Sequence, residues 1–271
     1  MKIMFCGDII GSSGRAVVAE HLPRLRRELE LDFVVVNGEN AAGGFGITAT
    51  LADDLFDCGA DVITTGNHIW DQREVVTYLV REPRLLRPIN YPPDSTPGNG
   101  AGVFETQRGQ KVLVVNVMGR LFMDPLDDPF VAIEAALDGH ELGAGIDAAI
   151  FDVHGEASSE KQAIGHFLDG RASLVVGSHT HVPTADTRIL EGGTAFQTDA
   201  GMCGDYDSVI GSEKAMWVQK FRTKMPVGRI TPSKGDGTLC AVYVETDEAT
   251  GLARRARPII VGGHLQARTL T

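Results

Sequence analysis

The sequence predicts an α/β fold in which two mixed β-sheets pack against each other and helices flank them. Short apolar runs alternate with helical patterns in the first half of the chain, as in parallel β-α units. The second half adds hairpin patterns, which indicate antiparallel strands and a second sheet. The 271 residues are 43% hydrophobic and contain no linker-like segment, so we expect one domain over residues 1–271.

The first β-α unit is expected at the amino terminus. Residues 2–7 are almost wholly apolar, which is typical of a strand buried on both faces, and Asp8 follows directly. The segment GSSGR at 11–15 opens a helix with apolar residues at helical spacing up to residue 29. Its glycines do not match GxGxxG, so a dinucleotide site is an alternative that only tight cofactor binding would revive.

Two further β-α units follow, and in each of them a short apolar strand ends in polar residues. We expect strands at 33–36 and 62–65, helices at 50–58 and about 72–80, and Gly59 as the C-cap of the first helix. Glu39 and Asn40 follow the first strand, and Asn67 and His68 follow the second. Ligands gather at the carboxyl ends of parallel strands, so these side chains are expected to lie beside Asp8.

The middle of the chain begins with a loop rich in proline and glycine at 87–100, which could flank or cover a site. The elements expected after it are a hairpin of residues 103–106 and 112–117, a short helix near 130–137, a buried strand at 148–153 that ends in His154, and a helix at 158–168 with Ser158 or Ser159 as N-cap.

Residues 174–186, LVVGSHTHVPTAD, repeat the pattern of an apolar run that ends in potential metal ligands. His179 and His181 are two residues apart, so whether their imidazoles point the same way depends on whether the backbone is extended or turns between them. Alone, the pair could be a surface feature, but the same pattern occurs at four earlier strand ends. A hairpin of 187–190 and 194–197 and strands near 239–245 and 253–260 complete the expected second sheet.

The charge and the cysteines limit the classes of function. A net charge of −11 and a pI near 5.2 argue against strong binding along a nucleic-acid backbone, whereas a small anionic substrate is compatible with bound divalent cations. The four cysteines form no CxxC pair, so free thiols are expected. The chain shows no secretory or membrane-spanning segment, and we expect a cytoplasmic protein with no membrane partner.

The residues at the strand ends carry carboxylate, amide and imidazole groups without a thiolate. Such a set suits iron(II), manganese or zinc, and it is large enough for two divalent ions. Each residue also has a structural alternative, such as helix capping for Asp8 or a left-handed turn for Asn67. The full set is Asp8, Glu39, Asn40, Asn67, His68, His154, His179 and His181.

The order of these motifs resembles the calcineurin-like metallophosphoesterase superfamily. Its blocks correspond here to GD at 7–8, GEN at 38–40, GNH at 66–68, DVHGE at 152–156 and GSHTH at 177–181. The segments GDIIG, NGEN, GNHIWD and the TDxGMxGxYDSVIG block at 198–211 are similar to the YmdB-like branch. The resemblance implies an α/β/β/α sandwich and a small phosphoester substrate.

The resemblance also implies a role for each residue. Metal 1 would bind Asp8, Glu39, Asn40 and His181, and metal 2 would bind Glu39, Asn67, His154 and His179. Asn40 would replace the superfamily histidine, because position 10 is Ile10. His68 would protonate the leaving group or stabilise the transition state. Asp71 is separated from it by two residues and could orient it or cap the next helix.

The activity that the resemblance implies is a phosphodiesterase that hydrolyses cyclic nucleotides, 2′,3′-cyclic ones in particular. A hydroxide between two metal ions, with iron or manganese preferred over zinc, would attack phosphorus. The alternatives are a phosphomonoesterase at the same site and a regulatory or RNA-interacting protein with little turnover. The sequence leaves open a homo-oligomer, and it does not define the roles of the 87–100 and 198–211 loops.

Overall fold

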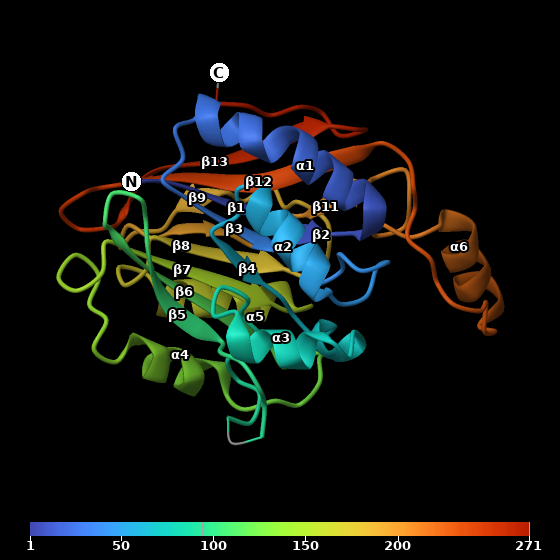
Figure 1. Ribbon diagram of the computed structural model, residues 1–271, viewed down its shortest axis with the longest axis horizontal. Helices are drawn as coiled ribbons and strands as arrows, with labels where there is room; N and C mark the ends of the chain where they lie inside the picture. The colour runs from blue at the N-terminus through green and yellow to red at the C-terminus, as the bar shows by residue number, and fades with distance from the viewer. Residues whose placement is uncertain (94, 271) are drawn as a thin grey trace.

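The computed structural model describes residues 1–93 and 95–270, and in this part of the chain two β-sheets lie face to face with helices on the outside (Figure 1). This arrangement confirms the predicted α/β fold with two mixed sheets. Asp94, in the predicted 87–100 loop, lies outside the described residues.

The first sheet follows the order β2-β11-β12-β1-β3-β4, with β13 paired to β12. β1, β3 and β4 are parallel, as predicted, whereas β12 is antiparallel to β1. Its strands are β1 (Lys2–Cys6), β2 (Asp8–Ile9), β3 (Phe33–Asn37), β4 (Val62–Thr64), β11 (Met202–Asp205), β12 (Gly237–Thr246) and β13 (Ala253–Gly262).

The second sheet follows the order β5-β6-β7-β8-β10-β9, in which the four inner strands are parallel and the two edge strands antiparallel. Both predicted hairpins, β5 with β6 and β9 with β10, are present. Its strands are β5 (Ala101–Glu105), β6 (Lys111–Met118), β7 (Ala148–His154), β8 (Leu174–Ser178), β9 (Arg188–Ile189) and β10 (Ala195–Gln197).

The prediction for the carboxyl-terminal strands was wrong in one respect. The strands expected near 239–245 and 253–260 belong to the first sheet, because β12 pairs with β1 from Lys2 opposite Glu245 to Cys6 opposite Ala241. Sequence patterns reveal a strand but not its neighbour, and the two ends of the chain meet here over a long sequence separation.

Helices cover both outer faces of the sandwich (Figure 1). α1 and α2 pack on the first sheet, and α4 and α5 pack on the second. α6 extends away from the sheets and contains no buried residue. The helices are α1 (Gly11–Glu28), α2 (Ala49–Asp57), α3 (Val75–Arg81), α4 (Pro129–Leu137), α5 (Ser158–Phe167) and α6 (Lys214–Thr223), with a short 3₁₀ turn at Ile69–Asp71.

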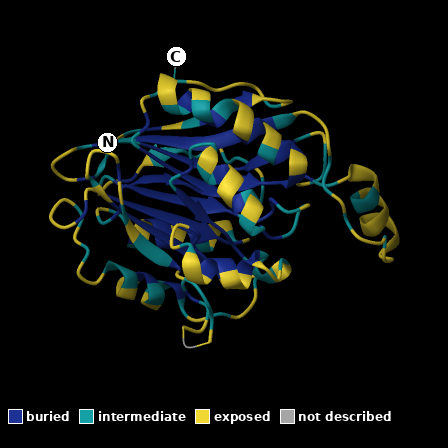
Figure 2. Ribbon diagram, viewed as in Figure 1, coloured by how far each residue is buried: buried dark blue, intermediate teal, exposed yellow. Residues whose placement is uncertain are grey.

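The central strands are buried on both faces, as their continuous apolar runs predict (Figure 2). In β1, Ile3 and Phe5 pack between the two sheets, whereas Met4 and Cys6 face the helices. This alternation follows from the two-residue repeat of a strand. Both sheets are therefore fixed in place by packing on each side, which gives rigid strand ends for a site.

The loops and helix ends show smaller differences from the predictions. Gly59 follows α2 with φ 107°, as expected for a C-cap glycine. The N-cap prediction for α5 was wrong: Ala157 occupies that position, because Ser158 is already helical. Arg87 donates hydrogen bonds to the carbonyl oxygens of Pro88 and Pro97 and so connects described residues of the 87–100 loop.

Two general properties of the chain are also clear from the structure. All four cysteines are free thiols, and three of them are buried. Among the described helices, none is long and apolar enough to cross a membrane.

Candidate metal centre

The polar strand ends of the two sheets meet at one place, where the sheets face each other. Asp8 begins β2, and Glu39 and Asn67 follow β3 and β4 in the first sheet. His154 ends β7 and His179 follows β8 in the second sheet. The site thus draws its side chains from both halves of the sandwich.

Four donor atoms converge on one point around His154. The Nε2 atom of His154 lies 2.7 Å from Glu39 Oε2, 3.1 Å from Asn67 Oδ1 and 3.1 Å from His179 Nδ1. Glu39, His154 and His179 form the group that could hold a metal ion in the described part of the chain. Oxygen and imidazole nitrogen at this spacing fit a divalent cation such as iron, manganese or zinc.

Unsatisfied buried oxygens mark a second group next to the first. Asp8 Oδ1, Glu39 Oε2 and Asn40 Oδ1 are buried and have no hydrogen-bond partner among residues 1–93 and 95–270. The 2.7 Å contact of Glu39 with His154 is an ion-pair distance that lacks hydrogen-bond geometry. Leaving a buried polar atom unpaired costs roughly 1–3 kcal/mol, and a bound cation is a partner that fits these oxygens.

The imidazoles face the site with their lone-pair nitrogens, because acceptor groups fix the hydrogen on the other nitrogen. His181 Nδ1 lies 2.8 Å from the carbonyl oxygen of Ile210, which can only accept, so Nε2 carries the lone pair. His179 Nε2 lies 3.3 Å from the Glu156 carboxylate, which leaves Nδ1 for the site.

His154 is oriented by a buried chain of hydrogen bonds. Ser178 Oγ donates its hydrogen to Asp152 Oδ1 at 2.6 Å. Ser178 Oγ therefore accepts a hydrogen bond from His154 Nδ1 at 2.9 Å. Asp152 also accepts hydrogen bonds from Asn37 at 2.9 Å and from Thr64 at 2.5 Å. The Nε2 lone pair of His154 is therefore directed at Glu39 and Asn67.

The electrostatics of the site follow from burial and close pairing. Burial raises the pKa of Asp8 to about 6, and the imidazoles of His181 and His154 oppose this shift. Burial also raises the pKa of Glu39, but the neighbouring His154 outweighs it and the pKa falls to about 2. Burial lowers the pKa of His179 to about 3, and the neighbouring His154 contributes to this shift. Glu39 is thus held as a carboxylate, and His179 as a neutral imidazole.

The loop that carries His179 and His181 turns sharply, which answers the question that their spacing left open. Both residues have positive φ, 97° and 66°, a conformation that costs roughly 1–3 kcal/mol in a non-glycine residue. Lys161 stabilises the turn: its buried Nζ donates to the carbonyl oxygen of Ser178 at 2.6 Å and to Asp199 at 2.8 Å. Asp199 in turn accepts from the main chain of Thr180 at 3.1 Å.

Gly66 of the GNH motif makes room for the cluster. A Cβ atom at this position would overlap the imidazole ring of His154. The glycine is therefore required by the close approach of the β4 strand end to β7, and not by an unusual backbone conformation.

His68 lies beside the donor cluster but outside it. Its main-chain nitrogen donates to Glu39 Oε1 at 2.9 Å, and its side chain is 30% exposed. The ring nitrogen Nδ1 lies 2.8 Å from Asp71 Oδ2, so Asp71 orients His68. The alternative helix-cap role for Asp71 does not hold, because Glu74 occupies the N-cap of α3.

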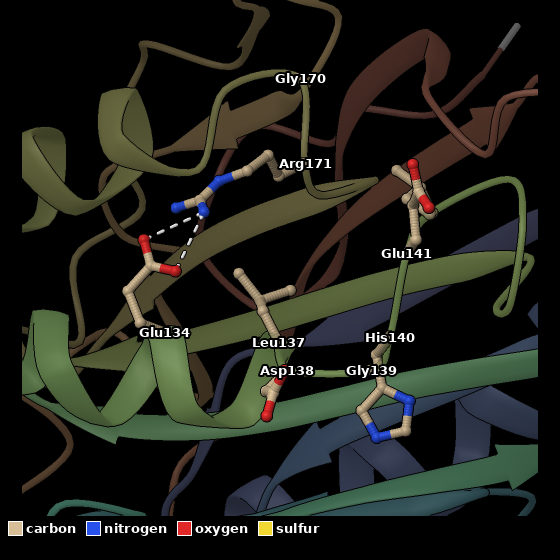
Figure 3. A pocket seen from close by; sticks show the side chains of 9 residues that line it. Glu134, Leu137, Asp138, Gly139, His140, Glu141, Gly170 and Arg171 are labelled. Carbon is tan, nitrogen blue, oxygen red and sulfur yellow. Dashed lines mark hydrogen bonds and ion pairs between the residues drawn. The ribbon is translucent and has the colours of Figure 1, made fainter.

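The donors open into a shallow cavity of about 250 Å³. Its lining residues are Glu39, Asn40, His68, Glu156, His179, Thr180, His181 and Ile210. A larger hollow of about 720 Å³ lies at the other end of β7, where Arg171 faces Glu134 (Figure 3). None of the residues predicted for the site lines that hollow.

All eight residues predicted for the site lie in or against this centre. Sequence reasoning missed the residues that support them, above all Asp152, Ser178, Lys161 and Asp199. Asp152 and Ser178 fall inside motifs that carry ligands, which was a usable signal. Lys161 gave none, since a lysine on a helix is ordinarily exposed.

Comparisons with known proteins show the family of the chain. Residues 4–259 match the family described as YmdB-like protein. The chain is 42% identical to the 2′,3′-cyclic-nucleotide 2′-phosphodiesterase of Bacillus subtilis (strain 168) over 96% of the chain and 97% of the relative.

Two solved structures are similar in both fold and sequence. A hypothetical protein from Thermus thermophilus has a TM-score of 0.90 and 40% identity over 97% of this chain and 100% of that one. A novel phosphatase from Mycoplasma pneumoniae has a TM-score of 0.89 and 31% identity over 97% of this chain and 93% of that one.

The hydrogen bond from His154 to Ser178 predicts the effect of Ser178→Ala. We expect metal affinity to fall by roughly 10- to 100-fold, because the imidazole loses the acceptor that fixes its tautomer. Isothermal titration with Mn²⁺ measures this change. Ser173→Ala is the matched control, since Ser173 is also buried and hydrogen-bonded but lies at the other end of β8. Equal losses of affinity in both variants would contradict the role of Ser178.

Proposed function

The chain belongs to the YmdB-like family of the metallophosphoesterase superfamily, and from this membership we propose that it hydrolyses 2′,3′-cyclic nucleotides at a pair of divalent metal ions. As a member of this family it is a metal-dependent phosphodiesterase. The observation that carries the proposal is the convergence of Glu39, Asn67 and His179 on the Nε2 atom of His154.

The proposed ligand sets divide the donors between two ions. Metal 2 takes the converging atoms of Glu39, Asn67, His154 and His179, and metal 1 takes Asp8, Asn40 and His181 together with Glu39. The unpaired oxygens of Asp8 and Asn40 support the second set. Mixed oxygen and nitrogen donors without a thiolate suit iron, manganese or zinc. When bound, the ions supply an activated water and neutralise charge on the phosphoryl oxygens.

Glu39 has the central place in this arrangement. It is 1% exposed, its Oε1 atom accepts from the main chain of His68, and its Oε2 atom faces His154. Asn37 Oδ1 accepts a hydrogen bond from the main chain of Glu39 at 3.0 Å, so the residue is fixed from both ends. A carboxylate held in this way can bridge two cations without rearranging.

His68 is the proposed general acid. Its Nδ1 hydrogen is directed to Asp71, so Nε2 can hold a proton at the edge of the cavity. In the cleavage of a 2′ ester bond, Nε2 of His68 would give its proton to the departing 2′ oxygen.

A phosphomonoesterase at the same centre is the second candidate, because a structurally similar protein is described as a phosphatase. Both activities use the same donors, so they differ only in what the cavity accepts. Comparing turnover of 2′,3′-cyclic AMP with that of adenosine 3′-monophosphate separates them.

Metal dependence provides the test of the proposed function. We expect chelated protein to lose hydrolysis of 2′,3′-cyclic AMP and to regain it with Mn²⁺ or Fe²⁺, because the buried oxygens then have cationic partners. Chromatography should identify adenosine 3′-monophosphate as the product of cleavage at the 2′ ester. Hydrolysis that persists in chelated, metal-free protein would refute the proposal, and metal binding without turnover would favour a regulatory protein.

Glu39→Gln should remove metal binding and turnover together. The amide keeps the shape of the side chain but loses the charge that holds two cations. Metal analysis and the rate with 2′,3′-cyclic AMP measure the two losses, and thermal unfolding checks the fold. Glu245→Gln is the control, since Glu245 pairs with Lys2 at the start of β1, the end of that strand away from the site. A fully active Glu39→Gln enzyme would exclude the bridging role.

His68→Ala should keep both metals but lower kcat by roughly 10²- to 10⁴-fold, the usual scale for a general acid. Asp71→Asn should give a smaller loss, because the ring of His68 remains but loses its charged partner. Rates are measured on samples of known metal content. If metal content falls in step with the rate, His68 is a ligand and the assignment is wrong.

A further inference from the structure

Glu156 lies at the edge of the candidate metal centre and belongs to neither proposed ligand set. It follows His154 and Gly155 and lines the cavity together with His68 and Asn40. Its side chain is 52% exposed, and its Oε2 atom lies 3.3 Å from His179 Nε2. Glu156 therefore contacts the ligand His179 without being a proposed ligand or the proposed general acid.

Holding His179 does not require the charge of Glu156. A neutral acceptor would fix the Nε2 hydrogen of the imidazole equally well, as the carbonyl oxygen of Ile210 does for His181. An ion pair this exposed also adds little stability. The negative charge at the edge of the cavity therefore calls for another explanation.

The cavity contains an unusual balance of charges for a phosphate site. Among its described lining residues there is no lysine or arginine, the side chains that ordinarily bind the oxygens of a phosphate dianion. The nearest buried lysine, Lys161, is engaged with Asp199 and the Ser178 carbonyl. Positive charge in the cavity would therefore come from the metal ions, and the carboxylate of Glu156 reduces the net positive charge there.

The proposed reaction changes the charge of the bound molecule. Hydrolysis adds one water: the bond from phosphorus to the 2′ oxygen breaks, that oxygen takes a proton, and hydroxide oxygen joins phosphorus. A cyclic diester has a single negative charge, whereas the monoester product has about −1.5 to −2 at pH 7. A fixed negative charge in the cavity thus weakens binding of the monoester product more than binding of the cyclic substrate.

We propose that Glu156 is a specificity-determining residue that repels phosphomonoester dianions, so that the site accepts diesters, rejects monoesters and releases its own product. This inference rests on the proposed function and extends it from the metal ligands to the choice of substrate. For a separation of about 6 Å between the Glu156 carboxylate and the phosphoryl group, and an effective dielectric constant of roughly 40 to 80, each unit of negative charge on the ligand weakens its binding by roughly three- to tenfold.

Glu156→Gln tests the charge alone, because glutamine keeps an acceptor for His179 Nε2. We expect the Mn²⁺-loaded variant to bind inorganic phosphate and adenosine 3′-monophosphate roughly five- to hundredfold more tightly by calorimetry, because these ligands carry about −1.5 to −2 charges. The ratio of kcat/KM for 3′-monophosphate to that for 2′,3′-cyclic AMP should rise by roughly two- to tenfold, because the two substrates differ by only about 0.5 to 1 charge. Metal content should equal that of the wild type.

Two comparisons isolate the effect. Glu141→Gln removes a carboxylate at the other end of β7 and should change neither binding nor the substrate ratio. Glu156→Asp keeps the charge and should behave like the wild type. The expected pattern is therefore a shift in the glutamine variant alone.

Unchanged affinity for phosphate in a fully metallated Glu156→Gln protein would overturn the inference. So would a loss of metal in that variant that the aspartate restores, because Glu156 would then be a positioning residue for His179. Phosphate binding is measured without turnover. A wild type that binds metal but fails to hydrolyse 2′,3′-cyclic nucleotides would therefore overturn the proposed function separately.

Discussion

The structure depends on one close contact, in which the buried carboxylate of Glu39 meets the buried imidazole of His154 at 2.7 Å. Asn67 Oδ1 and His179 Nδ1 each lie 3.1 Å from the same Nε2 atom of His154. The buried Oδ1 atoms of Asp8 and Asn40 have no hydrogen-bond partner among the described residues. Burying so many polar atoms without partners would be costly in a core that is otherwise apolar. Divalent cations bound at the proposed centre would convert this cost into coordination, and metal binding would then stabilise this region.

The same contact joins the two sheets. Glu39 extends from the first sheet and His154 from the second, and Asp152 of β7 accepts hydrogen bonds from Asn37 and Thr64 of the first sheet. His179, after β8, donates its main-chain hydrogen to Asp8 at 3.1 Å. Apolar packing between the sheets fixes their distance but permits sliding, whereas these directional bonds fix their register. The two packed sheets therefore position the donor side chains. The hydrogen bonds of Asp152 and Asp8 between the sheets in turn fix how the sheets are aligned.

Sequence reasoning succeeded where chemistry was local. Apolar runs located the strands, and polar residues directly after them located Asp8, Glu39 and His154 at a shared edge. It failed where the determinant was distant in the chain. The pairing of β12 with β1 and the buried contact of Lys161 with Asp199 depend on segments that only the folded structure brings together. The orientation of each imidazole also needed the structure, because it is set by acceptors such as Ser178 and Ile210.

The backbone around His179 and His181 explains why such distant support is needed. Positive φ at two histidines is unfavourable, and no glycine relieves it. The turn nevertheless brings one imidazole toward His154 and the other toward the Ile210 carbonyl, two directions that an extended segment could not supply. Lys161 is almost fully buried, and its ammonium group can be accommodated there only because Asp199 and the Ser178 carbonyl surround it. Through these groups the loop main chain is hydrogen-bonded at Ser178 and at Thr180, on either side of His179, which holds the turn and its imidazoles in place.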